Sequence, residues 1–315
     1  MNEVAVTGAS GFIGSHLLEL LAARADMRVR ALVRGSHRLK NGNIMPVSGD
    51  LMRRETLTDF IVPGSVVVNL AYLEDKPREE NLKAAANLAE TCRQAGIRRL
   101  IHLSTAVVAG RSGGVVNEGT SCQPLTEYER TKEEVERLLQ WEYGRFFEVV
   151  VLRPTAVFGP RGKNLLGLAD GRTRGSRIVN YLKSCLLDKR RMNLVCIANV
   201  VAAIVFLMEA QEKLSGEIFI VSDDEDPANN YRDVERYLMR RFGIADHRLP
   251  RIPLPPLILS LLLLLKGRSN WSPATVYDGG KLAAAGFKKP TSFGEGLDSF
   301  AAWYDEVFLA PAGKR

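Results

Sequence analysis

Short apolar runs alternate with amphipathic stretches through the first half of the chain. This alternation is typical of βαβ units, whose parallel strands are buried on both faces and joined by helices. The apolar runs predict strands over residues 3–7, 28–33, 44–48, 65–70, 99–104 and 147–152. Apolar residues spaced three and four apart predict helices over 12–24, 53–60, 80–95 and 126–142.

The chain after Pro160 is less regular. A Gly- and Arg-rich stretch comes first, and a predicted helix at 199–210 and a strand at 217–221 follow it. Five prolines between 227 and 256 then break the chain into short pieces. We therefore expect an α/β fold with a Rossmann-type doubly wound parallel sheet in residues 1–160, to which 195–221 return, and a smaller C-terminal lobe formed by 161–194 and 222–315.

The run 254–265 is the most apolar segment of the second half. Two prolines and Ser260 interrupt it, and it is shorter than the roughly 20 residues that cross a bilayer. It predicts no transmembrane segment but a buried or surface-docked helix, with weak peripheral membrane contact as the alternative.

The net charge of +7 fits a nucleic acid, a membrane surface or an anionic small substrate. The basic residues are dispersed, and the densest groups, at 161–177 and 189–191, lack interleaved aromatic residues that stack on bases. We expect no nucleic-acid partner. The basic groups indicate either a solvated rim or a site for phosphates.

Four cysteines and four histidines are scattered without metal-ligand or C-x-x-C spacing, so we expect no metal site and no disulfide framework. This cysteine usage favours a reducing compartment. The chain opens directly into a predicted strand without a secretory leader pattern, and the cytoplasm is the expected location.

A glycine-rich motif lies between the first predicted strand and helix, and it runs Gly8-Ala9-Ser10-Gly11-Phe12-Ile13-Gly14. Glycine permits a tight turn and lets backbone N–H groups approach a pyrophosphate, while the helix N-terminus favours negative charge. The position at the first βα junction predicts a dinucleotide site. A tight turn without a ligand would also favour glycine.

The end of the second strand selects between dinucleotides in such folds, because a carboxylate there binds the ribose 2′-OH of NAD and an arginine the 2′-phosphate of NADP. The strand ends in Arg34, followed by His37, Arg38 and Lys40, with no carboxylate. We therefore expect NADP, with NAD as the alternative. Arg34 is otherwise an exposed loop charge.

Tyr128 and Lys132 stand four residues apart on a predicted helix and so project from one face. A phenol has an ordinary pKa of about 10, and a nearby ammonium favours its ionised form. The pair predicts proton transfer. The same spacing arises by chance on solvent-facing helices.

The G-x-x-G-x-x-G turn, the Y-x-x-x-K pair and the segment His102–Gly110 resemble those of the extended short-chain dehydrogenase/reductases of the NAD(P)-dependent epimerase/dehydratase type, including their nucleotide-sugar-modifying branch. The resemblance covers nearly the whole chain. It implies that Thr105, with Ser104 beside it, polarises the substrate oxygen. A strand-end cap or a buried hydroxyl is the alternative for both residues.

The resemblance also implies further site residues. Asn81 would shape the active site, although a capping role explains it equally well. Asp50 would lie by the adenine ring, unless it caps the next helix. The remaining residues implied to contact the cofactor, besides the glycine-rich turn, Ser104, Tyr128 and Lys132, are Leu51, Leu70, Ala71, Pro154 and Val157.

Departures from the family narrow the expected reaction. Ala106 and Val107 replace the Asp-Glu pair of the sugar dehydratases, so dehydration is not expected. Ala156 and Asn199 replace an asparagine and an aspartate of many nucleotide-sugar epimerases, which weakens the case for a bound diphosphate. The arginines available for a pyrophosphate are Arg161, Arg172, Arg174, Arg177, Arg190 and Arg191.

We expect an enzyme that epimerises or reduces a small, anionic, nucleotide-activated sugar by hydride transfer, with Tyr128 as the acid and base. The alternatives are reduction of an apolar ketone or oxidation of an apolar alcohol, as in steroid and flavonoid members with 254–265 lining the pocket, and NADP(H) binding without turnover. The helices at 80–95 and 126–142 pair across a two-fold axis in relatives, which favours a homodimer.

Overall fold

The computed structural model describes residues 2–35, 42–110, 114–247, 252 and 274–309. The chain divides into two compact units. The first unit comprises residues 1–108, 126–153 and 201–219, and the second comprises 109–125, 154–200 and 220–315. The predicted residues His37, Arg38 and Lys40 and the apolar run 254–265 lie outside the described residues.

A seven-stranded sheet has the strand order β10-β7-β5-β4-β1-β2-β3. The pairings among β1, β2, β3, β4, β5 and β7 are parallel. The chain builds outward from β1 in one direction and then from β4 in the other, which places a topological switch point between these two strands. The strands are β1 (Asn2–Thr7), β2 (Met27–Val33), β3 (Ile44–Ser48), β4 (Val66–Asn69), β5 (Arg99–Leu103), β7 (Glu148–Pro154) and β10 (Ile218–Val221).

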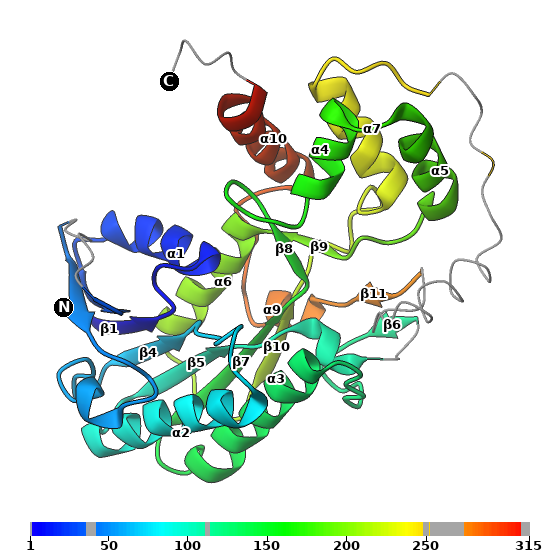
Figure 1. The fold of residues 1–315 in the computed structure, drawn as a ribbon. Helices are drawn as coiled ribbons and strands as arrows, with labels where there is room; N and C mark the ends of the chain where they lie inside the picture. The colour runs from blue at the N-terminus through cyan, green and yellow to red at the C-terminus, as the bar shows by residue number, and fades with distance from the viewer. Residues whose placement is uncertain (1, 36–41, 111–113, 248–251, 253–273, 310–315) are drawn as a thin grey trace. The chain divides into compact units, whose positions relative to one another are not determined.

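Helices cover both faces of this sheet (Figure 1). α2 (Arg78–Ala95) and α3 (Glu127–Leu138) lie on one face, and α1 (Phe12–Ala22) and α6 (Ile197–Glu209) lie on the other. A π turn, η3 (Leu139–Tyr143), extends α3. Two short 3₁₀ turns are η1 (Arg54–Leu57) and η2 (Ala106–Ala109).

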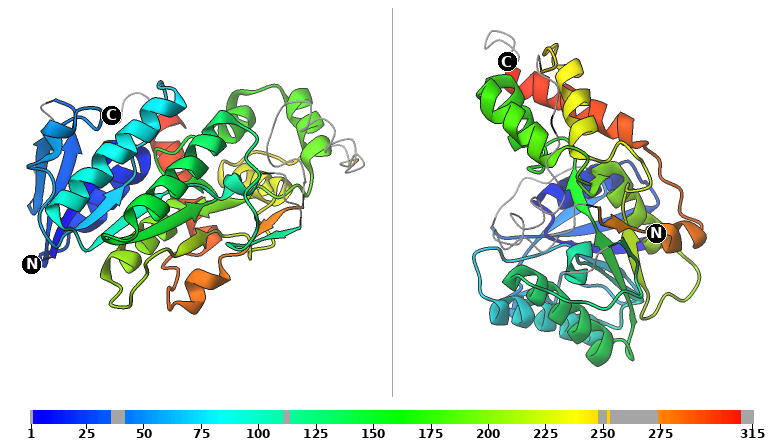
Figure 2. Two further views of the ribbon diagram at one scale, coloured as in Figure 1. Left: turned by 90° about the horizontal axis from the view of Figure 1, so that it is seen from below. Right: turned by 90° about the vertical axis from the view of Figure 1, so that its right-hand side faces the viewer.

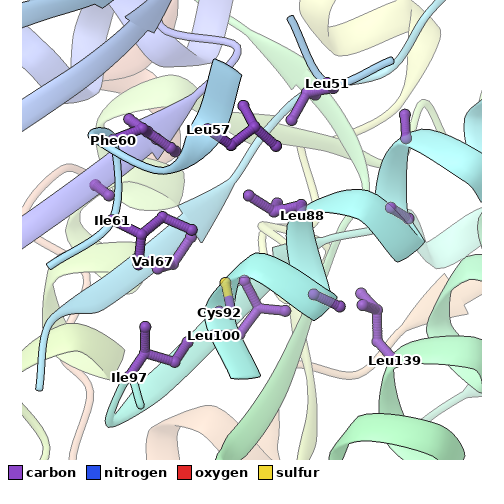
Figure 3. Close-up of a cluster of buried hydrophobic side chains, with 14 of the residues drawn as sticks. Leu51, Leu57, Phe60, Ile61, Val67, Leu88, Cys92, Ile97, Leu100 and Leu139 are labelled. Atoms are coloured by element: carbon purple, nitrogen blue, oxygen red, sulfur yellow. The ribbon is translucent and has the colours of Figure 1, made fainter. Parts of the chain in front are cut away.

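The core beneath α2 explains why the central strands are apolar on both faces. Leu57, Phe60, Leu88, Cys92 and Leu100 are fully buried there, and Figure 3 shows them converging from η1 and the turn after it, α2 and β5. Burying a large aliphatic or aromatic side chain stabilises the fold by about 1.5–3 kcal/mol. This cluster fixes α2 on the sheet.

The second unit has its own core, formed by Phe158, Leu238, Phe300, Tyr304 and their neighbours. Figure 2 shows its helices α7 and α10 side by side. Its helical elements are α4 (Leu166–Arg174), α5 (Arg177–Leu187), α7 (Tyr231–Arg241), α9 (Gly280–Ala284), α10 (Phe293–Tyr304) and the π turn η4 (Asp305–Leu309). Its strands pair as β8 (Ala156–Phe158) with β9 (Leu194–Cys196), and β6 (Val115–Val116) with β11 (Val276–Tyr277).

The predicted fold class is confirmed, and the predicted strands lie within two residues of those observed. The helix predicted at 53–60 is wrong, because only η1 forms there. The Thr56 hydroxyl donates to the backbone carbonyls of Arg53 and Asp50 and accepts from the Asp50 N–H, so it competes with a helical ladder. Within the described residues, no helix is long and apolar enough to span a bilayer.

Arg99 is a fully buried charge at the start of β5. Its guanidinium donates to Glu148 at 2.7 Å and to the backbone carbonyls of Leu207, Ala210 and Glu212. These bonds tie β5 to the last turn of α6 and to the chain that follows it. They satisfy a charge that would otherwise be costly to bury.

We expect Arg99→Met to lower the free energy of unfolding by about 3–5 kcal/mol, because it leaves Glu148 and three carbonyls without their partner. Arg93→Met is the matched control. It removes a solvent-exposed pair with Glu90 and should lower the free energy of unfolding far less than Arg99→Met does. Urea unfolding followed by circular dichroism measures both values, and equal losses in the two variants would contradict the structural role of Arg99.

Candidate active site

A glycine-rich turn joins β1 to α1. Gly8 has a φ of 65°, and a Cβ atom there would lie 2.8 Å from the backbone carbon of Leu70. A Cβ atom on Gly14 would lie 2.2 Å from the Gly8 carbonyl oxygen. Both positions therefore require glycine. α1 has neither a side-chain cap nor an acidic residue in its first turn, which suits its N-terminal N–H groups to an anion.

The turn borders a groove of about 1120 Å³, including its open mouth, which is large enough for an organic cofactor. Eleven predicted cofactor residues line it: Gly8, Ser10, Gly11, Phe12, Ile13, Gly14, Arg34, Asp50, Leu51, Leu70 and Ala71. Leu32, Val33, Leu73 and Glu74 also line the groove and were not predicted as site residues. Glu74 lies in the loop after β4, where the sequence carries no periodic signal.

Arg34 and Asp50 differ in whether their charged groups bond to other parts of the protein. Arg34 is exposed, and no hydrogen bond or ion pair holds it among the described residues. One carboxylate oxygen of Asp50 accepts from the Met52 N–H at 2.9 Å. Asp50 therefore closes a local turn and caps no α-helix, because η1 begins after Arg53. Its second carboxylate oxygen has no hydrogen-bond partner among the described residues.

Tyr128 and Lys132 lie on α3, whose start is fixed by a capping box between Thr126 and Glu129. The Lys132 ammonium donates to the Leu103 carbonyl at the end of β5, at 2.9 Å. The Thr105 hydroxyl, two residues after β5, lies near enough to the Tyr128 phenol to oppose the rise in its pKa. The structure thus brings three predicted catalytic residues together at the end of one strand.

Tyr72 joins this group, and sequence reasoning missed it as a site residue. Its ring meets the Tyr128 ring edge-on, with centroids 5.0 Å apart. Its centroid also lies 5.2 Å from the Lys132 ammonium, within range of a cation–π contact. A contact between the loop after β4 and α3 is not local in sequence, so no spacing rule could have found it.

Burial controls the ionisation of the pair. It raises the pKa of Tyr128 to about 12, Tyr72 adds to the rise, and the Thr105 hydroxyl opposes it. Burial lowers the pKa of Lys132 to about 8, against a rise caused by Glu136. Lys132 is not among the causes that shift the pKa of the phenol in the free protein, so the expectation that it lowers this pKa is not met. Tyr128 as a whole residue nevertheless remains 40% exposed.

Three further residues were predicted to contact the cofactor, and none of them lines the groove. The Ser104 hydroxyl is buried and has no hydrogen-bond partner among the described residues. Pro154 and Val157 belong to the second unit, so their contacts with a cofactor stay predictions. Within the described part of the chain, no group of three or more His, Cys, Asp or Glu side chains is placed to hold a metal ion.

Comparison with known proteins assigns the chain to a family. The model of the NAD dependent epimerase/dehydratase family matches residues 4–222, which is more than half of the chain. The chain belongs to the NAD-dependent epimerase/dehydratase family. The family assignment predicted from the glycine-rich turn and the Y-x-x-x-K pair is thereby confirmed.

Relatives within this family differ in substrate. The chain is 29% identical to the UDP-glucose 4-epimerase of Vibrio cholerae over 288 residues, which cover 85% of this chain and 83% of the relative. It is 27% identical to sterol demethylase protein B of Methylococcus capsulatus over 282 residues, covering 83% and 80%. The crystal structure of UDP-glucuronic acid 4-epimerase from Bacillus cereus in complex with NAD aligns with a TM-score of 0.73 over 99% of both chains, at 20% identity.

Asn81 does not cap α2, whose N-cap residue is Pro77 without a side-chain cap bond, but it holds the preceding loop. Its amide nitrogen donates to the carbonyls of Leu73, Lys76 and Pro77, and its oxygen accepts from the Leu73 N–H at 2.9 Å. These bonds fix the loop between β4 and α2. A direct role of Asn81 in this epimerase/dehydratase site stays a prediction.

Several side chains that were predicted to bind a substrate diphosphate already make polar contacts within the second unit. Arg172 is buried against Glu235 and Tyr231, and Arg191 donates to the carbonyls of Asp224 and Asp226. Arg174 donates to the Phe308 carbonyl. The Asn199 amide is fully buried and donates to Asp223 and to the Thr291 carbonyl. These contacts stabilise the second unit and draw the polar groups away from a ligand.

The lowered pKa of Lys132 predicts a pH-dependent stability. Below about pH 8 the folded state must charge a buried amine, whereas in the unfolded chain the pKa returns to 10.5. The resulting penalty is complete below pH 8 and disappears as the pH rises toward 10.5. Lys132→Met should therefore raise the free energy of unfolding at pH 7 by up to about 3 kcal/mol, and the gain should shrink by pH 10.

Urea unfolding at pH 7 and at pH 10 measures this difference. Lys83→Met, an exposed lysine of α2, is the control and should change stability equally little at both pH values. A Lys132→Met protein that is less stable than the parent at pH 7 would show that the ammonium contributes more by its contacts than its burial costs.

Proposed function

We propose that this protein is an oxidoreductase that transfers hydride between a nicotinamide cofactor and a secondary alcohol or ketone, with Tyr128 as the acid and base. The observation that carries the proposal is the convergence of Tyr128, Thr105 and Lys132 at the end of β5. The same unit holds the glycine-rich groove. A bound nicotinamide supplies or accepts the hydride.

Each residue has a distinct task in this reaction. In the reducing direction, Tyr128 donates its phenolic proton to the substrate oxygen as the carbonyl carbon gains hydride, so that an alcohol and a phenolate result. Thr105 donates a hydrogen bond to the same oxygen. The Lys132 ammonium stabilises the phenolate and binds the nicotinamide ribose. The reverse direction returns the proton to Tyr128.

NADP is the proposed cofactor, and Arg34 supports it. The arginine lines the groove with no competing ion pair among the described residues, so its guanidinium is available to a 2′-phosphate. NAD is the alternative, because it fits the same groove and is the cofactor named in the family description. A ribose 2′-OH would not use the charge of Arg34.

A small, anionic, nucleotide-activated sugar is the first substrate candidate, handled by epimerisation or keto-reduction. The similarity to the Vibrio cholerae UDP-glucose 4-epimerase over most of the chain supports it. In this proposal the second unit binds the substrate, and Pro154 and Val157 contact the nicotinamide. Arg161, Arg177 or Arg190 would meet the diphosphate.

An apolar ketone or alcohol is the second candidate, and one observation favours it. Arg172, Arg174, Arg191 and Asn199 are bound within the second unit, which leaves fewer groups for a diphosphate. The similarity to sterol demethylase protein B also supports an apolar substrate. A protein that binds NADP(H) without turnover is the remaining alternative, and it gives no reason for Tyr128 and Lys132 to lie together.

We further propose a homodimer through the outer faces of α2 and α3. The Trp141 side chain in η3 is 71% exposed, and Arg137 lies 4.3 Å from the centroid of its ring. Leu82 and Leu138 line the same shallow groove. A large exposed aromatic residue rimmed by charges is typical of a protein interface.

Tyr128→Phe should lower kcat by about 10³-fold, because it removes the proton donor while keeping the ring. The Kd for NADPH should stay within about threefold of the parent value. Tyr143→Phe, which removes a hydroxyl outside the groove, is the control. Turnover is followed by NADPH absorbance and product chromatography with nucleotide-sugars and with hydrophobic ketones, and activity confined to one class identifies the substrate. An active Tyr128→Phe protein would refute the assignment.

Arg34→Asp should reverse the cofactor preference. A carboxylate repels the 2′-phosphate and accepts from the ribose 2′-OH, so the ratio of kcat/KM for NADPH to that for NADH should fall at least about tenfold. Arg145→Asp makes the same charge change outside the groove and should leave the ratio unaltered. An unchanged ratio in Arg34→Asp would mean that Arg34 is a surface charge without a role in binding.

A further inference from the structure

A chain of buried hydrogen bonds runs from the nucleotide groove toward Lys132. The Ala71 N–H donates to the Thr7 hydroxyl oxygen at 3.4 Å, and the Thr7 hydroxyl donates to the Asn69 side-chain oxygen at 2.6 Å. These two bonds fix the orientation of the Asn69 amide, with its oxygen toward Thr7. Its NH₂ group therefore faces the other way, where it lies 3.2 Å from His102 Nδ1.

This orientation determines the state of the His102 ring. An amide NH₂ is a donor, so Nδ1 must accept, and a neutral ring then carries its proton on Nε2. His102 is fully buried on β5, and burial, with the charge of Lys132 as a second cause, holds its pKa well below the usual range. Burial therefore favours the neutral ring, and the contact with Asn69 places its proton on Nε2.

The Nε2 atom is buried and has no hydrogen-bond partner among the described residues. His102 and Lys132 line the same small cavity, together with Asn69, Asn81, Thr131 and Tyr72. A buried donor without a protein acceptor costs free energy, which argues for a use. On the side that His102 lines, the Lys132 ammonium therefore faces the Nε2–H donor and no hydrogen-bond acceptor.

The other titratable groups near Lys132 leave this conclusion unchanged. Tyr128 and Glu136 come from α3, and Tyr72 follows β4. Arg153 on β7 forms a buried ion pair with Glu136, so that carboxylate is already engaged. The Lys132 ammonium donates instead to the Leu103 carbonyl at 2.9 Å.

We propose that His102 is a positioning residue: held as the Nε2–H tautomer by Asn69, it denies Lys132 an acceptor inside the cavity and keeps the ammonium on Leu103 and toward Tyr128. Two donors do not bond each other, so the remaining ammonium protons point toward the mouth of the site. The inference rests on the proposed function, because it gives Lys132 a place to act. Asn69 and Thr7 connect this arrangement to Ala71 in the groove.

The tautomer can be observed directly, without any turnover. Long-range ¹H–¹⁵N NMR of ¹⁵N-histidine-labelled full-length protein, assigned by comparison with His102→Gln, should show one Nε2–H tautomer that does not titrate between pH 6 and 8. An Nδ1–H ring, or an imidazolium in this range, would overturn the inference whatever the catalytic result.

Asn69→Asp replaces the amide donor that faces His102 with a carboxylate acceptor and changes the shape of the side chain very little. A carboxylate at 69 accepts from Nδ1–H, which moves the proton off Nε2 and turns that nitrogen into an acceptor for the ammonium. The pKa of Lys132, followed with ¹³C-lysine-labelled protein and assigned with Lys132→Met, should rise by about one unit. In the active enzyme, kcat should fall about tenfold while KM for the cofactor changes less than threefold.

Substitutions of His102 supply a second, independent series. Gln places an N–H donor near the position of Nε2, whereas Leu offers none, so His102→Gln should keep kcat within about threefold of the parent and His102→Leu should lose about tenfold. Equal kcat in the parent and His102→Leu, or an unchanged Lys132 pKa in a folded Asn69→Asp protein, would refute the positioning role. Absence of turnover in the parent protein would instead refute the proposed function, and the two NMR measurements would still decide the inference.

Discussion

The site depends on one buried hydrogen bond, from the Lys132 ammonium to the Leu103 carbonyl. This bond fixes α3 against the end of β5, so the Tyr128 phenol, one turn earlier on α3, lies near Thr105. An amine buried in this way loses hydration, which is the reason its pKa falls. The fold tolerates the cost because the core beneath α2 and the ties of Arg99 stabilise the same sheet.

The site also requires that the backbones of β1 and β4 approach each other closely at the switch point of the sheet. Gly8 packs against the backbone at the end of β4, and Thr7 bonds Asn69 across the same pair of strands. Any side chain at Gly8 would push β1 from β4 and break the Thr7–Asn69 bond. The glycine-rich turn therefore shapes the groove and also keeps in register the polar residues below the Lys132 cavity.

The sequence was informative wherever one period or one local turn sets the structure. The parallel sheet, the glycine-rich turn and the shared face of Tyr128 and Lys132 each follow from spacing within a few residues. The failures have the opposite character. Residues 53–60 have helical spacing because Leu57, Phe60 and Ile61 all enter the core, yet side-chain bonds from Thr56 end the helix after one turn. The contacts of Tyr72 and His102 join separate strands and helices, and the sequence does not show them.

The same distinction between local spacing and the surrounding structure explains why the predicted lowering of the Tyr128 pKa is not observed. Spacing shows that a lysine lies beside Tyr128, and a charge nearby suggests a lowered pKa, but desolvation depends on the whole surrounding structure. Glu136 illustrates this dependence, because it lies one turn after Lys132 and raises the lysine's pKa, while its ion pair with Arg153 compensates much of its charge. Without Arg153 the carboxylate charge would be less compensated and would raise the pKa of Lys132 further. The ion pair with β7 thus moderates the attraction of Glu136 for the ammonium, and the pKa of about 8 leaves Lys132 charged at neutral pH.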